Sequence, residues 1–325
     1  MPLKLDKVSR RYDDKWVLRD FSPEAIEGEI FGLIGANGAG KSAALRLIAG
    51  REKPNSGQIF FNGNDVTNDS AKTRNYTLLA EEENQSAWKN LFKPAKSDAL
   101  SGGERLTNGF EKALRQAENV LLLDNPFACL DPISREESFE KLRKTAQEKN
   151  LIVVLAINDF EAAFLACDRL GVLHKGEIVQ TGTPRELYEQ PNSVAVAALL
   201  GRNNLIAARR VTFNNQPIPE FQTLTGDHRL QTGKMERIAL GTITSDVTLM
   251  IRPEHISISF GASFPEDNLL KAKIVGVQYC GATTRVKLDA GGLMLEALVL
   301  RLVGLNLGDE CLVGLPPDRI LVLKR

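Results

Sequence analysis

The chain has 325 residues, enough for about two domains, and 43% of them are hydrophobic, which allows a buried core. Its 41 basic residues balance its 41 acidic residues, so nothing suggests broad electrostatic attraction to nucleic acid or to an anionic membrane, and we expect no nucleic-acid partner. No apolar run has the length of a membrane span and the first residues do not form a signal peptide, so we expect a cytosolic protein.

Two short segments open the chain. Residues 3–10 and 16–22 are expected to form edge strands around a turn at residues 12–15. Tyr12, in this turn, comes shortly before the next strand, where an aromatic ring could stack on a nucleotide base. For this residue alone, a packed or surface tyrosine is the simpler interpretation.

A phosphate-binding motif follows. Residues 35–42 read Gly-Ala-Asn-Gly-Ala-Gly-Lys-Ser and match the pattern G-x-x-x-x-G-K-[ST], between a buried strand predicted at 29–34 and a helix predicted at 42–49. Glycines allow backbone N–H groups to surround a phosphate chain, and the helix N-terminus contributes its positive dipole end. The motif therefore predicts a nucleotide-phosphate site in which Lys41 reaches the β- and γ-phosphates and the Ser42 hydroxyl binds Mg²⁺.

Two further motifs lie after the phosphate loop, at residues 100–104 and 120–124. Residues 100–104 read Leu-Ser-Gly-Gly-Glu and lead into a helix predicted at 105–116. Residues 120–124 form a continuous apolar strand, as in a parallel sheet, and its final Asp124 is placed to hold Mg²⁺. Because strands and helices alternate, we expect an α/β fold with a mostly parallel sheet. The other predicted elements are a strand at 58–61 with a hairpin at 62–63, helices near 133–148 and 160–167, and strands at 151–157, 170–173 and 178–180.

The phosphate loop, the LSGG sequence and the apolar strand with its aspartate, in this order, resemble the ATP-binding subunit of an ABC transporter. Residues 176–184, which read GEIVQTGTP, and the pair Leu187-Tyr188 are similar to the importer group that includes the iron(III), sulfate, polyamine and maltose systems. The resemblance implies an ATP-binding P-loop domain over residues 1–205. It also implies ATP and Mg²⁺ as cofactors, transmembrane permease subunits and a second ATP-binding cassette subunit as partners, and a place on the cytoplasmic face of the inner membrane.

The resemblance further implies a set of site residues. Tyr12 would stack on adenine, and the loop residues that bind the nucleotide would be Gly35, Asn37, Gly38, Gly40, Lys41, Ser42 and Ala43. The residues that face the ATP on the partner subunit would be Ser101, Gly102 and Gly103. The residues at Mg²⁺ would be Ser42, Asp124 and Glu81, and Asp131 would contact the partner cassette.

Four positions depart from the family pattern. Asn125 stands where the family has the glutamate that polarises the attacking water, and Asn158 where it has the histidine that holds the γ-phosphate. Glu81 replaces a glutamine, and Ala43 replaces a threonine, which is a minor change. An asparagine can hydrogen-bond a water but cannot accept its proton, and losing a positioned base costs ~10²–10⁴-fold in rate. We therefore expect a pseudo-ATPase that binds Mg·ATP but hydrolyses it weakly or not at all; Glu81 or Glu82 acting as the base is the alternative.

Residues 82–99 are too few for the helical subdomain that the family places before the LSGG sequence. They hold Trp88, Leu91 and Phe92 and can form one short helix at most. In the family that subdomain forms much of the groove that receives the permease. Its shortening therefore argues against the usual coupling to a permease.

We expect residues 206–325 to form a small all-β barrel domain. Their sequence consists of short segments in which hydrophobic and polar residues alternate, separated by turn residues. Residues 251–256 read Ile-Arg-Pro-Glu-His-Ile and resemble a motif of the oligosaccharide-binding-like domain that ends these importer subunits. Such domains serve regulation or dimer contacts, and some bind a small oxyanion. We expect His255 on a strand, in a structural role. The predicted strands are 206–213, 237–240, 247–251, 271–277, 285–288, 294–299, 311–315 and 320–323.

The cysteines do not indicate metal or disulfide chemistry. They are Cys129, Cys167, Cys280 and Cys311, scattered without C-x-x-C pairing. We expect buried free thiols rather than a disulfide framework or a zinc site.

Two functional interpretations are open. The chain is either a degenerate ATP-binding subunit of an importer, or a non-transport regulatory or structural subunit that binds a nucleotide and acts through its β-domain. The importer-type C-terminal domain favours the first, and the short 82–99 segment favours the second. A fully active ABC ATPase of another kind is disfavoured, because such proteins carry two cassettes or long coiled coils. The altered residues serve the chain's own ATP whereas the LSGG sequence serves a partner's, so we expect pairing with an intact cassette in preference to a homodimer.

Overall fold

The computed structural model describes residues 2–80, 102–128, 130–211, 218–233, 246–260, 268–300 and 304–323. The chain divides into two compact units, Met1–Glu189 and Gln190–Arg325. The end of an independently folding ATP-binding domain at residue 205 stays a prediction. No helix within the described ranges is long and apolar enough to cross a membrane.

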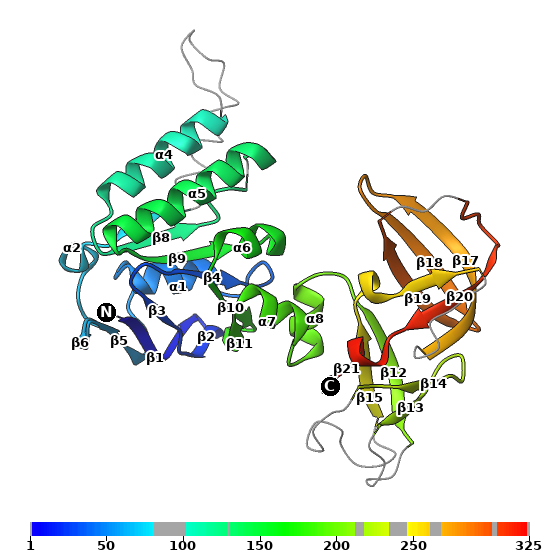
Figure 1. Ribbon diagram of the computed structural model, residues 1–325. Helices are drawn as coiled ribbons and strands as arrows, with labels where there is room; N and C mark the ends of the chain where they lie inside the picture. The colour runs from blue at the N-terminus through cyan, green and yellow to red at the C-terminus, as the bar shows by residue number, and fades with distance from the viewer. Residues whose placement is uncertain are drawn as a thin grey trace. The chain divides into compact units, whose positions relative to one another are not determined.

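A six-stranded sheet forms the centre of the first unit, in the order β11-β10-β4-β9-β8-β7 (Figure 1). The strands from β10 to β7 are parallel, and β11 pairs antiparallel with β10 at one edge. Every residue of β4, β8 and β9 is buried, as their continuous apolar sequences predict. The predicted α/β fold with a mostly parallel sheet is therefore confirmed. The strands are β4 (Ile30–Ile34), β7 (Thr77–Leu79), β8 (Val120–Asp124), β9 (Ile152–Ile157), β10 (Arg169–His174) and β11 (Glu177–Gly182).

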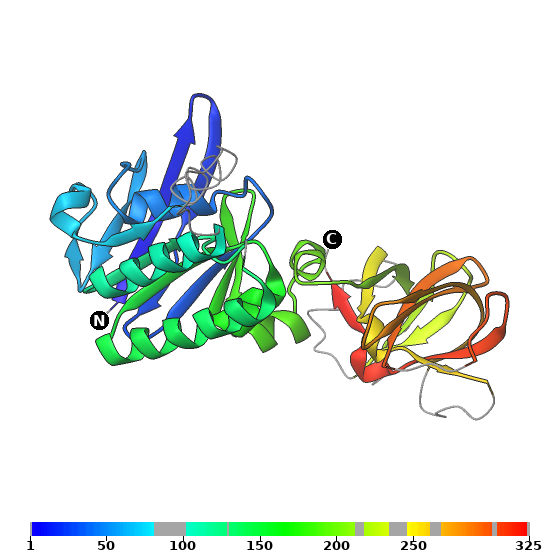
Figure 2. The ribbon, with the colours of Figure 1, turned by 90° about the horizontal axis from the view of Figure 1, so that it is seen from above.

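Helices cover both faces of this sheet. The helix α1 (Lys41–Ile48) packs against β8 and β9, and its leucines join a core shared with the N-terminal strands. On the opposite face α6 packs against β4 and β9, and α4 and α5 run side by side, joined by an ion pair of Glu111 with Lys141 (Figures 1 and 2). Two short helices, α2 and α7, complete the set in the described part of this unit. The bounds are α2 (Ala71–Arg74), α4 (Gly102–Gln116), α5 (Pro132–Lys149), α6 (Phe160–Ala166) and α7 (Pro184–Glu189).

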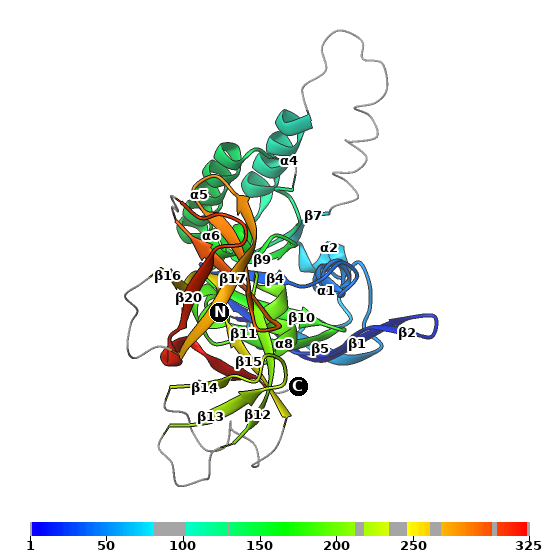
Figure 3. The same cartoon turned by 90° about the vertical axis from the view of Figure 1, so that its right-hand side faces the viewer.

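An antiparallel sheet in the order β2-β1-β5-β6 packs into the same core as α1, and β3 also pairs with β1. The sequence predicts β1 at an edge, which is wrong, because β1 pairs with β2, β3 and β5. The predicted hairpin at Asn62-Gly63 is confirmed, and both residues have the positive φ that a two-residue turn of this kind requires. Figure 3 shows the β1–β2 hairpin in dark blue. The strands are β1 (Pro2–Tyr12), β2 (Lys15–Phe21), β3 (Glu24–Ile26), β5 (Ser56–Phe61) and β6 (Asn64–Asp65).

Two five-stranded antiparallel sheets form the second unit around one apolar core, which confirms the predicted all-β architecture. Their orders are β14-β13-β12-β15-β21 and β16-β20-β17-β18-β19. The helix α8 (Val194–Leu199) belongs to this unit, and its Ala197 packs against Met250 and Leu323. The strands are β12 (Asn204–Arg210), β13 (Glu220–Thr223), β14 (Arg229–Gln231), β15 (Asp246–Ile251), β16 (Ser257–Ser259), β17 (Asn268–Tyr279), β18 (Thr284–Ala290), β19 (Leu293–Val299), β20 (Glu310–Leu315) and β21 (Leu321–Leu323).

Two expectations about single residues are wrong. His255 lies in a 3-10 helix (η2, Pro253–His255) and not on a strand, because Pro253 has the φ of a helix start and no N–H for a strand ladder. Cys280 is exposed, whereas Cys167 and Cys311 are buried free thiols as expected. Cys129 and the strand predicted at 237–240 lie outside the described residues.

Candidate nucleotide-binding site

The phosphate loop joins the end of β4 to the start of α1, and two of its glycines have no room for a side chain. A Cβ on Gly35 would lie 2.4 Å from the carbonyl oxygen of Leu173, in β10. Gly40 has a φ of +111°, and a Cβ there would lie 2.7 Å from the carbonyl oxygen of Val17, in β2. The approach of these two strands determines the path of the loop, and only glycine fits at both positions.

Lys41 begins α1 and folds back over the loop. Its ammonium group donates to the carbonyl oxygens of Gly35, at 2.6 Å, and Ala36, at 3.1 Å. The N-cap of α1 is Gly40 rather than a polar side chain, and the first turn holds no acidic residue. The N–H groups and the positive dipole end of α1 can therefore serve an anion.

Three polar residues stand at the C-terminal ends of β8 and β9. Asp124 is the buried last residue of β8, Asn125 comes next, and Asn158 follows β9. The Asn125 N–H donates to the carbonyl oxygen of Ala156 at 2.8 Å, which ties the two strand ends together. Asn125 has a φ of +48°, in the left-handed region that asparagine tolerates better than most residues. The turn therefore supplies a backbone reason for asparagine at this position.

A cavity of about 460 Å³ brings these groups together. Its wall combines the phosphate loop, the first turn of α1 with Arg46 one turn further, the ends of β8 and β9 and the tip of the β1–β2 hairpin. The volume falls in the range of small-molecule sites, about 300–1,000 Å³. The lining residues are Tyr12, Val17, Asn37, Gly38, Gly40, Lys41, Ser42, Ala43, Arg46, Asp124, Asn125 and Asn158.

The donor atoms in this wall fit Mg²⁺. Ser42 brings a hydroxyl and Asp124 a carboxylate to the same cavity. Mg²⁺ prefers oxygen ligands, keeps several waters and is commonly held by one or two protein groups together with substrate phosphates. No cluster of three or more His, Cys, Asp or Glu side chains occurs in the part of the chain that the structure describes. The Ser42 hydroxyl and the Asp124 carboxylate are thus the residues that would hold Mg²⁺.

Tyr12 contacts charged residues that no sequence motif indicates. Its hydroxyl donates to Glu52, and Arg46 donates to both Tyr12 and Glu52. The Arg10 guanidinium lies over the tyrosine ring, 4.8 Å from its centroid. Burial opposes ionisation of Glu52, but the hydrogen bonds from Tyr12 and Arg46 outweigh it, so the pKa of Glu52 is lowered. One signal could have found Arg46: it follows Ser42 by one helical turn and shares its helix face.

Arg74 anchors the other end of α1. Its guanidinium donates to the carbonyl oxygens of Leu47 and Ile48, at 2.7 Å each, and to those of Val66 and Thr67. The side chain is buried, and burial lowers the pKa of Arg74. A cation at this end satisfies the last carbonyls and complements the helix dipole. Arg74 therefore fixes the helix whose other end forms the site.

The other predicted site residues lie elsewhere. Gly102 and Gly103 are the first residues of α4. Asp131 is the N-cap of α5, where its carboxylate accepts two backbone N–H bonds at 3.0 Å. The residues predicted from sequence that fall outside the described ranges are Glu81, Glu82, the segment 82–99 and Ser101.

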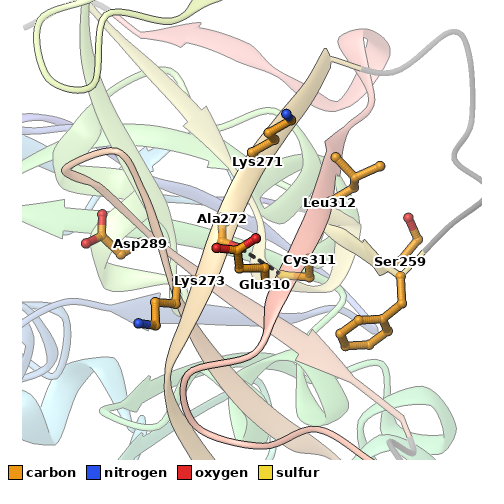
Figure 4. A pocket seen from close by; sticks show the side chains of 9 residues that line it. Ser259, Lys271, Ala272, Lys273, Asp289, Glu310, Cys311 and Leu312 are labelled. Atoms are coloured by element: carbon orange, nitrogen blue, oxygen red, sulfur yellow. Dashed lines mark hydrogen bonds between the residues drawn. The ribbon is translucent and has the colours of Figure 1, made fainter.

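A second cavity, of about 430 Å³, lies in the second unit at the exposed face of β17 and β20 (Figure 4). Lys273 on β17 stands opposite Glu310 on β20 and Asp289 on β18, so positive and negative side chains alternate across the strands. None of the predicted site residues lines it. The lining residues are Ser259, Phe260, Lys271, Ala272, Lys273, Asp289, Glu310, Cys311 and Leu312.

Comparison with known proteins gives two family matches and a group of relatives. The model of the ABC transporter family matches residues 18–94, and the model of the TOBE domain matches residues 249–323. The sulfate/thiosulfate import ATP-binding protein CysA of Synechocystis is 33% identical over 247 residues, covering 66% of this chain and 70% of that protein. The molybdate/tungstate import ATP-binding protein WtpC of Pyrococcus horikoshii is 28% identical over 340 residues, covering 94% of each. The Fe(3+) ions import ATP-binding protein FbpC 1 of Pectobacterium atrosepticum is 28% identical, covering 99% of this chain and 96% of that protein.

Proposed function

Because the chain belongs to the ABC transporter family, among the ATP-binding subunits of importers, we propose that it binds Mg·ATP at the phosphate loop and hydrolyses it weakly or not at all. The family membership confirms the resemblance that the sequence motifs indicate, including the importer-type C-terminal domain. The residue assignments, the low turnover and an asymmetric assembly are proposals that go beyond that membership.

The observation that carries the proposal is the lining of the 460 Å³ cavity. The phosphate loop, Lys41 and Asp124 are the groups that hold a triphosphate and its metal ion. Asn125 and Asn158 line the same cavity at the positions where the family has a base and a γ-phosphate donor. An amide donates and accepts hydrogen bonds but takes up no proton at neutral pH. Loss of the base costs ~10²–10⁴-fold in rate, and loss of the γ-phosphate donor costs a comparable factor.

ATP binding and ATP turnover depend on different residues of this site. One variant tests each of them. Calorimetric titration of the full chain with Mg·ATP is expected to give micromolar-range affinity, on the order of −8 kcal/mol. Lys41→Ala is expected to weaken that binding, because it removes the cation that reaches the phosphates. Asn125→Glu is expected to recover little turnover, because groups that act as a unit are non-additive and Asn158 is still an amide. Full turnover after this single change would refute the roles assigned to the two asparagines.

The same reasoning favours an asymmetric assembly. Asn125 and Asn158 affect the ATP on this chain's own loop, whereas the start of α4 would serve the ATP of a partner cassette. We therefore place the chain beside an intact cassette and a transmembrane permease, on the cytoplasmic face of the inner membrane. In such a complex, Ser101→Arg should abolish the partner's ATPase and Lys41→Ala should only weaken it. A complex purified from the native host that contains only copies of this chain, or the reverse ranking of the two variants, would refute the asymmetric assembly.

The names of the relatives support import but do not converge on one cargo, since they specify molybdate/tungstate, sulfate/thiosulfate and Fe(3+). The second candidate function is a non-transport nucleotide-binding subunit that acts through its β-domain. The cavity lined by charged side chains on β17 and β20 favours it. Co-purification with a transmembrane permease supports the importer subunit, and purification without one supports the alternative.

A further inference from the structure

We infer that Glu52 is a positioning residue for the base end of the nucleotide, because it holds Tyr12 and Arg46 in one arrangement at the cavity wall. This inference rests on the proposed function, since it takes the 460 Å³ cavity as the ATP site. Glu52 itself is not among the residues that line the cavity, whereas Tyr12 and Arg46 are.

Both oxygens of the Glu52 carboxylate are used. The Tyr12 hydroxyl donates to Oε2 at 2.5 Å, and Arg46 Nε donates to Oε1 at 2.7 Å. Arg46 Nη2 also donates to the Tyr12 hydroxyl oxygen at 3.3 Å, which closes a ring of three hydrogen bonds. The Glu52 side chain is only 20% exposed, so these charge-assisted bonds are partly shielded from water.

Arg10 adds a fourth contact and limits where a base can stack. Its Nε lies 3.2 Å from Glu52 Oε2, and its Nη1 donates to the carbonyl oxygen of Lys53 at 3.0 Å. Held in this way, its guanidinium covers one face of the Tyr12 ring. A base can therefore stack only on the other face of the ring. Glu52 contacts Tyr12, Arg10 and Arg46.

Tyr12 is distant in the sequence from Arg46 and Glu52, which are close neighbours of each other. Tyr12 ends β1, Arg46 lies in the last turn of α1, and Glu52 lies in the turn that follows α1. The backbone N–H of Glu52 donates to the carbonyl oxygen of Arg46 at 3.3 Å, so the turn places the carboxylate beside the arginine. Preorganised side chains lose less freedom when a ligand binds, and Glu52 provides that preorganisation for the base without contacting the phosphates.

The test compares ATP with inorganic tripolyphosphate, which has the phosphates and no base. The affinity of the full chain for each is measured by calorimetry with Mg²⁺, for the wild type, Glu52→Gln, Tyr12→Phe and the double variant. Glu140→Gln, at an exposed position of α5, is the control for loss of a surface carboxylate. Tyr12→Phe keeps the ring and removes only the hydroxyl, so it probes the same link if Glu52→Gln folds poorly.

We expect Glu52→Gln and Tyr12→Phe each to weaken ATP binding about three- to tenfold, and the double variant to be no weaker than the worse single variant. Tripolyphosphate affinity should stay within about twofold of the wild type in all of them, because Lys41 and the loop are untouched. Equal losses for both ligands, unchanged ATP affinity, or additive effects in the double variant would each overturn the positioning role. A wild type that binds neither ligand would instead refute the proposed function.

Discussion

Replacing Gly40 by alanine is expected to damage the phosphate loop far more than the same change at another glycine of positive φ. Gly40 has a φ of +111°, and a Cβ there meets the Val17 carbonyl oxygen at 2.7 Å and Leu18 Cδ2 at 2.8 Å. Gly28 is the matched control, because its φ is +74° and a Cβ there has nothing within 4 Å. The two substitutions therefore share backbone strain and differ in the clash.

The magnitudes follow from these contacts. A residue other than glycine at positive φ costs about 1–2 kcal/mol, which is the whole cost expected for Gly28→Ala. Overpacking against a backbone that cannot yield adds about 1–3 kcal/mol, so Gly40→Ala should lower the free energy of unfolding by about 2–5 kcal/mol. If β2 and the loop move apart to relieve the clash, the loop N–H groups lose their alignment, and ATP affinity should fall at least about tenfold.

Urea unfolding and calorimetric titration of both variants make this comparison. Gly28→Ala should keep wild-type ATP affinity, because the residue lies in a turn outside the cavity. If the two variants lose the same unfolding free energy, or if Gly40→Ala binds ATP as the wild type does, then the contact with Val17 does not determine the path of the loop.

Three further outcomes are expected. Arg74→Met should lower the free energy of unfolding by about 3 kcal/mol in urea titration, because it leaves carbonyl oxygens at the end of α1 without their donor; no change would contradict that anchoring role. Because the pKa of Glu52 is lowered in the folded chain, its stabilising contribution is complete above the ordinary glutamate pKa and is lost as the pH falls through the lowered value. The stability of Glu52→Gln should therefore fall less steeply than that of the wild type on that acid limb, and parallel curves would exclude the linkage. A fragment of residues 1–189 should keep ATP binding, and a soluble fragment that has lost it would show that the site needs the second unit.

The centre of the first unit was predictable because its strands are buried on both faces. Continuous apolar runs such as 120–124 and 151–157 identify such strands without knowledge of their neighbours, and β8 and β9 occupy them almost residue for residue. The phosphate loop was predictable because positions that only glycine can occupy, such as Gly35 and Gly40, leave a characteristic spacing in the sequence. By contrast, alternation in β1 does not reveal how many partners a strand has, and β1 lies inside its sheet rather than at an edge.

The hydrogen-bonded group around Tyr12 could not be predicted in the same way. The Tyr12 hydroxyl at the end of β1 reaches Glu52 in the turn after α1, and no local pattern connects residues so far apart in the chain. Strands β14 and β16 have three residues each, which is too short for an alternating pattern to distinguish them from turns. Asn125 shows a further limit: the sequence suggests a lost base, whereas its φ of +48° adds a backbone requirement that only coordinates reveal.

Phosphate release by the purified full chain at saturating Mg·ATP tests the central claim most directly. The cavity is lined by the phosphate loop and Lys41 and has amides at Asn125 and Asn158, so we expect turnover near the background of the Lys41→Ala variant even though calorimetry should detect binding. Turnover of about 1 s⁻¹ or faster that Lys41→Ala abolishes would contradict the claim, since it would require a base that these two side chains cannot supply.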